Sequence, residues 1–251
     1  MKGSRYSIIK LVESSDFIDQ VNDLLKGTKA KISVYDNWMP KRIHMDKEAE
    51  LNDFLKYNFS SDLQKKLTDW WLHVDATTPN WDLISTCMID GQRGILLVEA
   101  KAHRGELDKE TKAKPFDELN ASENSRSNHD RIEESINMAN AEINKKINGV
   151  SISRDQCYQL SNRVAHAWWL ASQGIPVVLM YLGFLNAKDM DDGKNKIFKD
   201  DAAWKDCFTN HSKQIGVDKI VGEWIKCGEG EKSGFKLIVK SINSSLNFKR
   251  Q

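Results

Sequence analysis

The chain has 251 residues, of which 40% are hydrophobic and 29% charged, a composition typical of a folded protein with a substantial core. Its formal net charge is only +1, which lacks the basic excess of many strong nucleic-acid binders, so any nucleic-acid surface must be a local patch. No apolar run is long enough to cross a membrane and no signal peptide is recognisable, so we expect a cytoplasmic protein. The four cysteines show no C-x-x-C spacing, and we interpret Cys87 and Cys157 as buried thiols in a reducing compartment.

The first part of the chain is predicted to be an appendage covering residues 1–45. Ser15 can cap a short amphipathic helix that stops at Gly27, because serine is a good N-cap and glycine a good C-terminal stop. A short strand is expected to follow over residues 31–35.

The core is predicted to begin with a helix capped by Asp46, with inward-facing residues Leu51, Phe54 and Leu55. Glu50 lies in the first turns of this helix, where we interpret it as a solvated carboxylate near a helix N-terminus. The first core strand is expected over residues 70–74.

A β-hairpin is predicted next, and it carries unusual charges. Residues 84–89 and 94–102 are two apolar runs separated by the turn-forming residues Asp90 and Gly91. Glu99 and Lys101 lie inside the second run. Charged side chains in a buried strand are costly unless they are paired or bind a metal, so these two residues need an explanation.

The register of the hairpin decides which side chains meet. With a two-residue loop, Ile89 pairs with Gln92 and Asp82 lies directly across from Glu99. With a four-residue loop, Asp82 lies across from Lys101 instead. Side chains alternate between the faces of a strand, so both registers place Asp82, Glu99 and Lys101 on one face.

This set of residues suits metal-assisted phosphate chemistry. The carboxylates of Asp82 and Glu99, with the backbone carbonyl of Ala100 and waters, are oxygen ligands suited to Mg²⁺ or Mn²⁺. Such a metal acidifies a bound water and polarises a phosphoryl oxygen. Lys101 can orient that water or offset charge that develops on the phosphate. The alternative is a cross-strand ion pair between Glu99 and Lys101 on an exposed sheet face.

The segment after His103 changes character. Residues 104–128 are charged and then rich in Asn and Ser, with little apolar content, so we expect a flexible insertion. It is either a mobile flap that contacts the substrate or a plain disordered insertion. A capping box at Ser127 and Asp130 then predicts an amphipathic helix that ends near Gly149.

The best-marked helix begins at the capping box of Ser153 and Gln156 and stops at Gly174. One arc of this helix is polar and consists of Gln156, Gln159, Asn162, Arg163 and His166. Residues 175–185 follow as an apolar run typical of a fully buried strand.

Residues 186–251 are predicted to be a C-terminal extension. Asp200 or Asp201 caps a helix in which His211 is interpreted as a packing residue rather than a ligand. Residues 236–242 can form an edge strand or a last segment packed against a helix.

Asp82, the Glu99-Ala100-Lys101 triplet and the order of elements together resemble the PD-(D/E)xK nuclease superfamily. The proline of that motif is displaced, since Pro79 stands three residues before Asp82. The resemblance implies a single α/β domain with the αβββαβ core of the restriction-endonuclease-like fold, a mixed central sheet flanked by helices. That core would span residues 46–185, with extra N- and C-terminal helices around it.

The resemblance also implies roles for single residues. Asp82, Glu99 and Lys101 would be catalytic, and Gln159 would point at the catalytic lysine or water. Arg163, one turn further along the helix, could hold a phosphate. Glu50 and His103 are additional candidates for the site, because a glutamate from the first core helix joins the metal in several such families.

The implied function is Mg²⁺- or Mn²⁺-dependent hydrolysis of phosphodiester bonds by an endonuclease, with DNA favoured over RNA as the substrate. Fold analogy does not fix activity. A non-catalytic nucleic-acid-binding or scaffold protein that keeps the fold is the alternative, and a partner could supply the DNA-binding surface. No membrane partner is expected, and a homodimer is compatible with the sequence.

Overall fold

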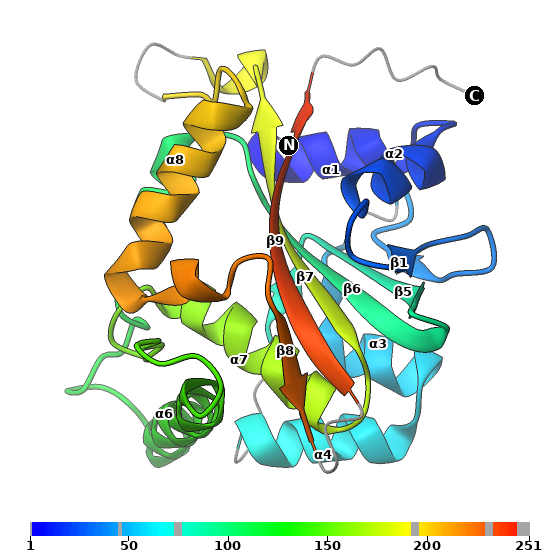
Figure 1. Ribbon diagram of the computed structural model, residues 1–251. Coiled ribbons are helices and arrows are strands. Elements are labelled where there is room, and N and C mark those ends of the chain that lie inside the picture. Colours follow the sequence, from blue (N-terminus) through cyan, green and yellow to red (C-terminus); the bar gives the residue numbers. More distant parts are fainter. Residues whose placement is uncertain (1, 45–46, 73–76, 192–195, 229–232, 245–251) are drawn as a thin grey trace.

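The computed structural model describes residues 2–44, 47–72, 77–191, 196–228 and 233–244. This part of the chain is a mixed α/β structure in which eight α-helices surround a curled mixed sheet of seven strands (Figure 1). None of these helices combines the length and apolar character that crossing a membrane requires. All four cysteines are free, and Cys87, Cys157 and Cys227 are buried.

The first half of the chain forms α1 Gly3–Val12, α2 Phe17–Leu24, β1 Ala30–Lys31, β2 Trp38–Met39, β3 Ala49–Glu50, α3 Leu51–Asn58, α4 Ser61–Trp71, β4 Asn80–Trp81, β5 Leu83–Ile89 and β6 Gln92–Lys101. The second half forms α5 Arg104–Glu110, α6 Glu123–Asn144, α7 Tyr158–Ser172, β7 Val177–Leu185, α8 Asp201–Ser212, β8 Trp224–Cys227 and β9 Ser233–Asn243. Short 3₁₀ turns lie at Lys188–Met190, Lys213–Ile215 and Val217–Ile220.

The large sheet has the strand order β1-β5-β6-β7-β9-β8, and β2 also pairs with β5. The β5–β6 hairpin is antiparallel, whereas β6, β7 and β9 run parallel to one another. A parallel pair needs a long crossover, and the chain between β6 and β7 supplies it with α5, α6 and α7. A separate two-stranded ladder joins β3 to β4.

The hairpin turn fixes the register that the sequence left open. Asp90 and Gly91 both have positive φ angles, 50° and 81°, as a two-residue turn of this type requires. Ile89 therefore pairs with Gln92, and Leu83 pairs with Val98 at the other end of the ladder. One residue further on, this register places Asp82 across from Glu99, so the two-residue alternative is confirmed.

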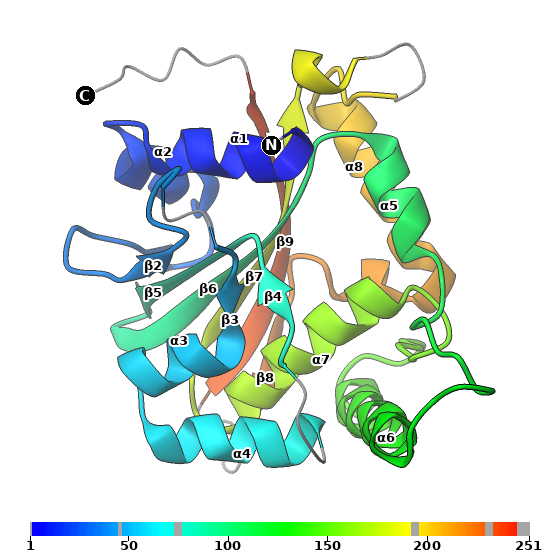
Figure 2. The same cartoon turned by 180° about the vertical axis from the view of Figure 1, so that it is seen from behind.

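Each face of the sheet has its own layer of helices (Figures 1 and 2). Leu96, Val98 and Ala100 of β6 share a buried cluster with residues of α1 and α2. The intervening residues Ile95 and Leu97 belong to the other cluster, which includes residues of α3, α4, α6, α7 and α8. Glu99 and Lys101 have the same parity as Ile95 and Leu97, so they point toward the layer that contains α7.

The N-terminal region, which the sequence suggested was an appendage, packs against the sheet. Helix α1 has no side-chain cap at its N-terminus, yet Ile8, Leu11 and Val12 are buried against the sheet with Val21 of α2. The expected strand at 31–35 is reduced to β1, which forms the edge of the sheet beside β5. The described residues 2–44 therefore contribute α1 and α2 to the layer on one face of the sheet.

Two other expectations in this region fail or fall outside the described residues. Trp70 and Trp71 end helix α4 instead of starting a strand, and residues 73 and 74 of the expected strand lie outside the described part. Asp46, the expected cap of the first core helix, also lies outside it, and Glu50 occupies the N-cap position of α3.

The C-terminal region, predicted as an extension, likewise contributes strands β8 and β9 to the sheet. β9 lies between β7 and β8, so it is an interior strand and not the edge strand that residues 236–242 suggested. Asp200 does cap α8, because its side chain accepts a hydrogen bond from the Ala203 N–H at 2.8 Å.

The expected flexible insertion at 104–128 holds regular structure at both ends. Residues 104–110 form α5, in which Leu107 is buried. Helix α6 begins at Glu123 with Ser122 as its cap, several residues before the predicted Ser127. The backbone between them bonds to the start of α7, since the N–H groups of Cys157 and Tyr158 donate to the carbonyls of residues 111 and 112.

The role of the N-terminal layer can be tested by removing one buried side chain. We expect Leu11→Ala to lower the free energy of unfolding by about 2–5 kcal/mol, because Leu11 is fully buried between α1 and the sheet. Val34→Ala is the control, since Val34 is largely exposed. Urea unfolding that finds equal stability for Leu11→Ala and wild type would restore the appendage interpretation.

Candidate functional site

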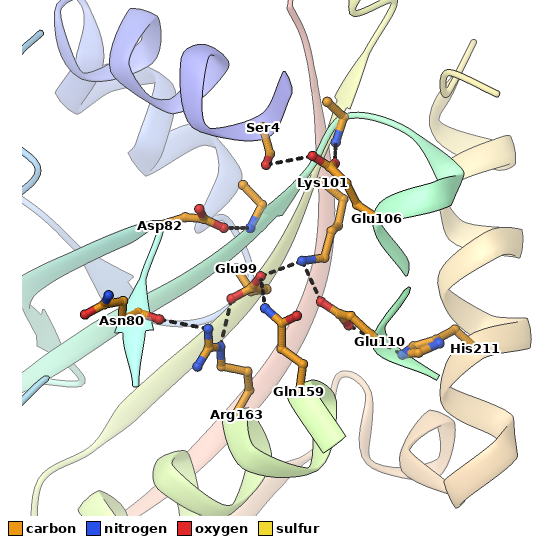
Figure 3. Close-up of polar contacts among 12 residues, drawn as sticks. Ser4, Asn80, Asp82, Glu99, Lys101, Glu106, Glu110, Gln159, Arg163 and His211 are labelled. Carbon is orange, nitrogen blue, oxygen red and sulfur yellow. Dashed lines mark hydrogen bonds and ion pairs between the residues drawn. The ribbon is translucent and has the colours of Figure 1, made fainter. Parts of the chain in front are cut away.

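The candidate site lies where the end of β6 meets α5, α7 and the bend before β5 (Figure 3). Glu99 and Lys101 project from β6 and are only 3% and 5% exposed. Asp82 comes from the bend between β4 and β5, and it is half-buried. Gln159 and Arg163 come from successive turns of α7, and both point toward Glu99 in Figure 3.

Glu99 is the centre of this arrangement. Its Oε1 accepts hydrogen bonds from Lys101 Nζ at 2.5 Å and from Gln159 Nε2 at 2.6 Å. Its Oε2 accepts from Arg163 Nε at 2.8 Å. A buried carboxylate needs such partners, because an uncompensated charge at this depth is strongly destabilising.

Arg163 links Glu99 to the β4 segment. Its Nη2 donates to the carbonyl oxygen of Asn80 at 2.8 Å, and its guanidinium carbon lies 4.3 Å from the ring centroid of Trp81. The polar arc expected on this helix is therefore turned inward over much of its length, and His166 is fully buried. Gln156 precedes α7 and is exposed, so it does not join the site.

Lys101 has a second carboxylate partner that sequence reasoning missed. Glu110, the last residue of α5, lies 2.5 Å from Lys101 Nζ through its Oε1. Its other oxygen lies 3.5 Å from Nε2 of His211 on α8, where His211 is a buried residue packed beside Glu110. The only sequence signal was the three-residue spacing of Leu107 and Glu110, which puts both on one helical face.

Asp82 anchors to the strand that carries Glu99. Its Oδ2 accepts a hydrogen bond from the backbone N–H of Ala100 at 2.7 Å. Burial, with the negative charge of Glu99 as the next cause, raises the pKa of Asp82 to about 8, although Lys101, the Ala100 bond and Arg163 act in the opposite direction. No cation among the described residues forms an ion pair with Asp82, although Lys101 and Arg163 lie near enough to lower its pKa.

The other two charged groups keep their ionised forms. Burial alone would raise the pKa of Glu99, but Arg163 and Lys101 outweigh it and hold that pKa below its usual range. Burial would likewise lower the pKa of Lys101, but Glu110, Glu99 and Asp82 outweigh it and raise that pKa. Lys101 is consequently an ammonium donor rather than a base.

Two candidates from the sequence lie apart from this cluster. Glu50 accepts hydrogen bonds at 3.1 and 3.3 Å from the N–H and hydroxyl of Thr78, next to the β3–β4 ladder. His103 is the N-cap residue of α5, and its Nε2 lies 4.0 Å from Glu106 Oε1. Among the described contacts, neither side chain reaches Glu99 or Lys101.

A further buried group borders the site from β7. Tyr181 pairs with Glu99 in the β6–β7 register and is fully buried. Its hydroxyl has no hydrogen-bond partner among the described residues. Burial, with the charges of Glu110 and Glu99, raises its pKa well above the usual value, so the hydroxyl stays protonated and remains available as a donor.

The possible metal ligands at the site can be compared with the ligands that different metals prefer. No group of three or more His, Cys, Asp or Glu side chains suited to a metal is found in the part of the chain that the structure describes. The site offers two carboxylates, Asp82 and Glu99, and the Ala100 carbonyl on the strand between Glu99 and Lys101. Zn²⁺ usually takes three or four nitrogen or sulfur ligands, whereas Mg²⁺ keeps waters and accepts one or two carboxylates.

A polar cleft of about 820 Å³ opens beside the cluster, and Gln159 and Arg163 lie in its wall. Residues 77–80, the segment 114–121 and the facing sides of α6 and α7 form the remaining walls. The cleft therefore gives a ligand access to the two side chains that hold Glu99.

No protein-family model, curated protein or solved structure gives a significant match to this chain. The site must therefore be interpreted from its own geometry.

The unusual state of Asp82 predicts a measurable effect on stability. The pKa of Asp82 is about 8 in the folded protein and near 3.8 when it is unfolded, so the folded state holds an extra proton between these values. Wild-type stability should fall as pH rises through that window and level off above it. An asparagine at this position cannot titrate, so Asp82→Asn should not lose stability in this way. The free energy of unfolding of Asp82→Asn minus that of wild type should therefore increase by more than about 1 kcal/mol between pH 4.5 and pH 8.5.

The measurement is urea unfolding of both proteins in EDTA across this pH range. Asp90→Asn in the exposed hairpin turn is the matched control and should follow the wild type. Parallel pH profiles for wild type and Asp82→Asn would show that Asp82 ionises normally.

Proposed function

We propose that this protein is a Mg²⁺- or Mn²⁺-dependent nuclease that hydrolyses phosphodiester bonds in DNA, with an endonuclease site built on a restriction-endonuclease-like core. The observation that carries the proposal is the buried Glu99–Lys101 pair, which Asp82 faces from the opposite strand and Gln159 contacts from the following helix. Buried ionisable groups with perturbed pKa values gather at functional sites more often than elsewhere.

The arrangement of elements supports the same proposal. The β5–β6 hairpin is followed by α7 and then by β7, which pairs in parallel with β6. This corresponds to the last two strands of the three-stranded meander, the crossover helix and the final strand of an αβββαβ core. The place of the first strand of that meander, on the far side of β5, is held by the short strands β1 and β2.

The lone pairs at the site leave room for a hard cation. Asp82 Oδ1 has no partner among the described residues, and Glu99 Oε2 accepts only one described hydrogen bond. These two atoms and the Ala100 carbonyl are the groups that would hold Mg²⁺, with waters and substrate phosphate completing the ligand shell. A bound Mg²⁺ would acidify a water and polarise a phosphoryl oxygen.

The chain's own residues would then act on the substrate. Lys101 keeps its proton, so its role is to donate to the attacking water or to the charge that develops on the phosphate, and not to remove a proton. Gln159 fixes the orientation of Glu99. Arg163 uses Nε and Nη2 within the protein, and no described partner contacts its Nη1, so it can bind a phosphate oxygen while it still holds Glu99.

Metal binding is the first consequence to test. We expect Mg²⁺ or Mn²⁺ to bind with roughly micromolar to millimolar affinity, because few carboxylates make only a modestly tight site. Because the pKa of Asp82 is raised to about 8, the metal competes with a proton, so affinity should rise with pH and level off above about pH 8.

Titration calorimetry in buffers of different protonation enthalpy measures both the affinity and the proton released. Asp82→Asn should weaken binding at least about tenfold, since it removes a charged ligand. Equal binding by wild type and Asp82→Asn would remove Asp82 from the metal site.

Cleavage is the second consequence. Lys101→Ala should reduce the rate of DNA cleavage by about a hundredfold or more while most of the affinity for DNA remains, because an interaction made in the transition state affects rate more than binding. Single-stranded, double-stranded and branched DNA should be tested with and without Mg²⁺ or Mn²⁺.

Lys101 is buried between two carboxylates, so its removal also threatens the fold. Gln159→Ala is the second variant, because it removes one hydrogen bond to Glu99 and leaves the ion pairs intact. Lys26→Ala, in the turn after α2, is the matched control, since Lys26 is exposed and pairs only with Asp23 among the described residues. A wild type that binds DNA but cuts none of the substrates, with a Lys101→Ala variant that binds equally well, would favour the non-catalytic binding protein.

A further inference from the structure

The cleft beside the site has features that the hydrolysis of a phosphate does not need. It extends from Gln159 and Arg163 to the segment 114–121, and its volume of about 820 Å³ is within the range of roughly 300–1,000 Å³ typical of small-ligand pockets. Its walls are rich in side-chain amides, contributed by Asn80, Asn120, Asn128, Gln159 and Asn162.

One of these amides is an unusual buried group. Asn162 is 4% exposed, and its Nδ2 donates to the Tyr158 hydroxyl at 3.2 Å. Its Oδ1 has no hydrogen-bond partner among the described residues. Buried polar atoms usually have a partner, so this acceptor in a residue of the cleft wall is a candidate contact for a donor on a ligand.

The cleft also offers flat apolar surfaces and a cation. Phe116 lines it and stacks on the His129 ring, with the centroids 3.9 Å apart and the planes 11° apart. Tyr158 and Trp71 line other parts of the wall. Lys114 is half-buried in the same segment, and burial together with the charge of Arg154 lowers its pKa. No described anion is paired with its ammonium group.

Amides, aromatic rings and a lysine are together the groups that recognise a nucleotide. Amide groups match the donors and acceptors on the edge of a base, aromatic rings stack on its face, and lysine binds the phosphate. We propose that this cleft is the binding site for an unpaired nucleotide of the DNA substrate, next to the bond that is cut. The inference rests on the proposed function, because it takes Glu99 and Lys101 as the place of cleavage.

An unpaired nucleotide fits these walls better than a duplex. In a double helix the Watson–Crick edges are paired and the base faces are stacked, so a base can stack on Phe116 and present its Watson–Crick edge to Asn162 only if it is extruded. An unpaired base presents both its face and its edge. Single-stranded segments, flaps or the unpaired parts of branched DNA are therefore the expected ligands of the cleft.

The test is the binding of fluorescein-labelled single-stranded DNA and of a blunt duplex of the same sequence, followed by anisotropy in EDTA so that no cleavage occurs. Wild type should bind the single strand about tenfold or more tightly than the duplex. Phe116→Ala should lower single-strand affinity about 5- to 150-fold, because a base loses its stacking surface. Lys114→Ala should make the salt dependence of binding shallower. The slope of log binding constant against log salt concentration should become less negative by about 0.7, because one phosphate contact is lost.

Asn162→Ala should also weaken single-strand binding, whereas the Lys26→Ala control on the opposite layer should not. Thermal melts of each variant show whether the fold is kept. Variants that stay folded and bind the single strand as the wild type does would overturn the inference, as would an equal or higher affinity for the duplex.

The outcome is separable from that of the proposed function. Single-strand binding that depends on Phe116 and Lys114, in a protein that never cuts DNA, would support the cleft and reject the nuclease. Metal-dependent cutting that is unchanged by these substitutions would support the nuclease and reject the cleft.

Discussion

The ion pair between Glu99 and Lys101 is the constraint on which the surrounding structure depends. Both charges lie on a strand that is buried on both faces, so each needs partners supplied by other elements. α7 provides Gln159 and Arg163 for the carboxylate, and α5 provides Glu110 for the ammonium. The positions of these helices over the sheet are therefore constrained by their polar contacts with Glu99 and Lys101 as well as by apolar packing.

Such an arrangement is a poor way to gain stability. Buried ion pairs often contribute little beyond what apolar residues of similar volume would, and here Asp82 adds a carboxylate that is not fully compensated, so burial raises its pKa to about 8. A chain selected only for stability would be expected to lose that acid. The presence of this acid opposite Glu99 is understandable if a cation displaces its proton and offsets the resulting negative charge, and this is the physical basis of the proposed metal-dependent chemistry.

The sequence was informative where local rules decide the structure. The turn chemistry of Asp90 and Gly91 set the hairpin, and the period of two then placed Asp82, Glu99 and Lys101 together. The polar arc of α7 identified Gln159 and Arg163 for the same reason, since helical periodicity is local. Long-range packing was not readable, because α1 lacks a cap and α5 is short and charged. The contacts of Glu110 with Lys101 and His211 therefore became apparent only from the packing of α5 against β6 and α8.

The central claim is that Asp82 and Glu99 together hold a divalent cation. Crystals grown or soaked with Mn²⁺ and measured near the manganese absorption edge would test it most directly. The account predicts an anomalous peak within coordination distance of a carboxylate oxygen of both Asp82 and Glu99, with the Lys101 ammonium beside it. Two results would contradict this claim. One is a well-ordered site in which neither carboxylate binds metal at millimolar Mn²⁺, and the other is an anomalous peak found only at a different place on the protein.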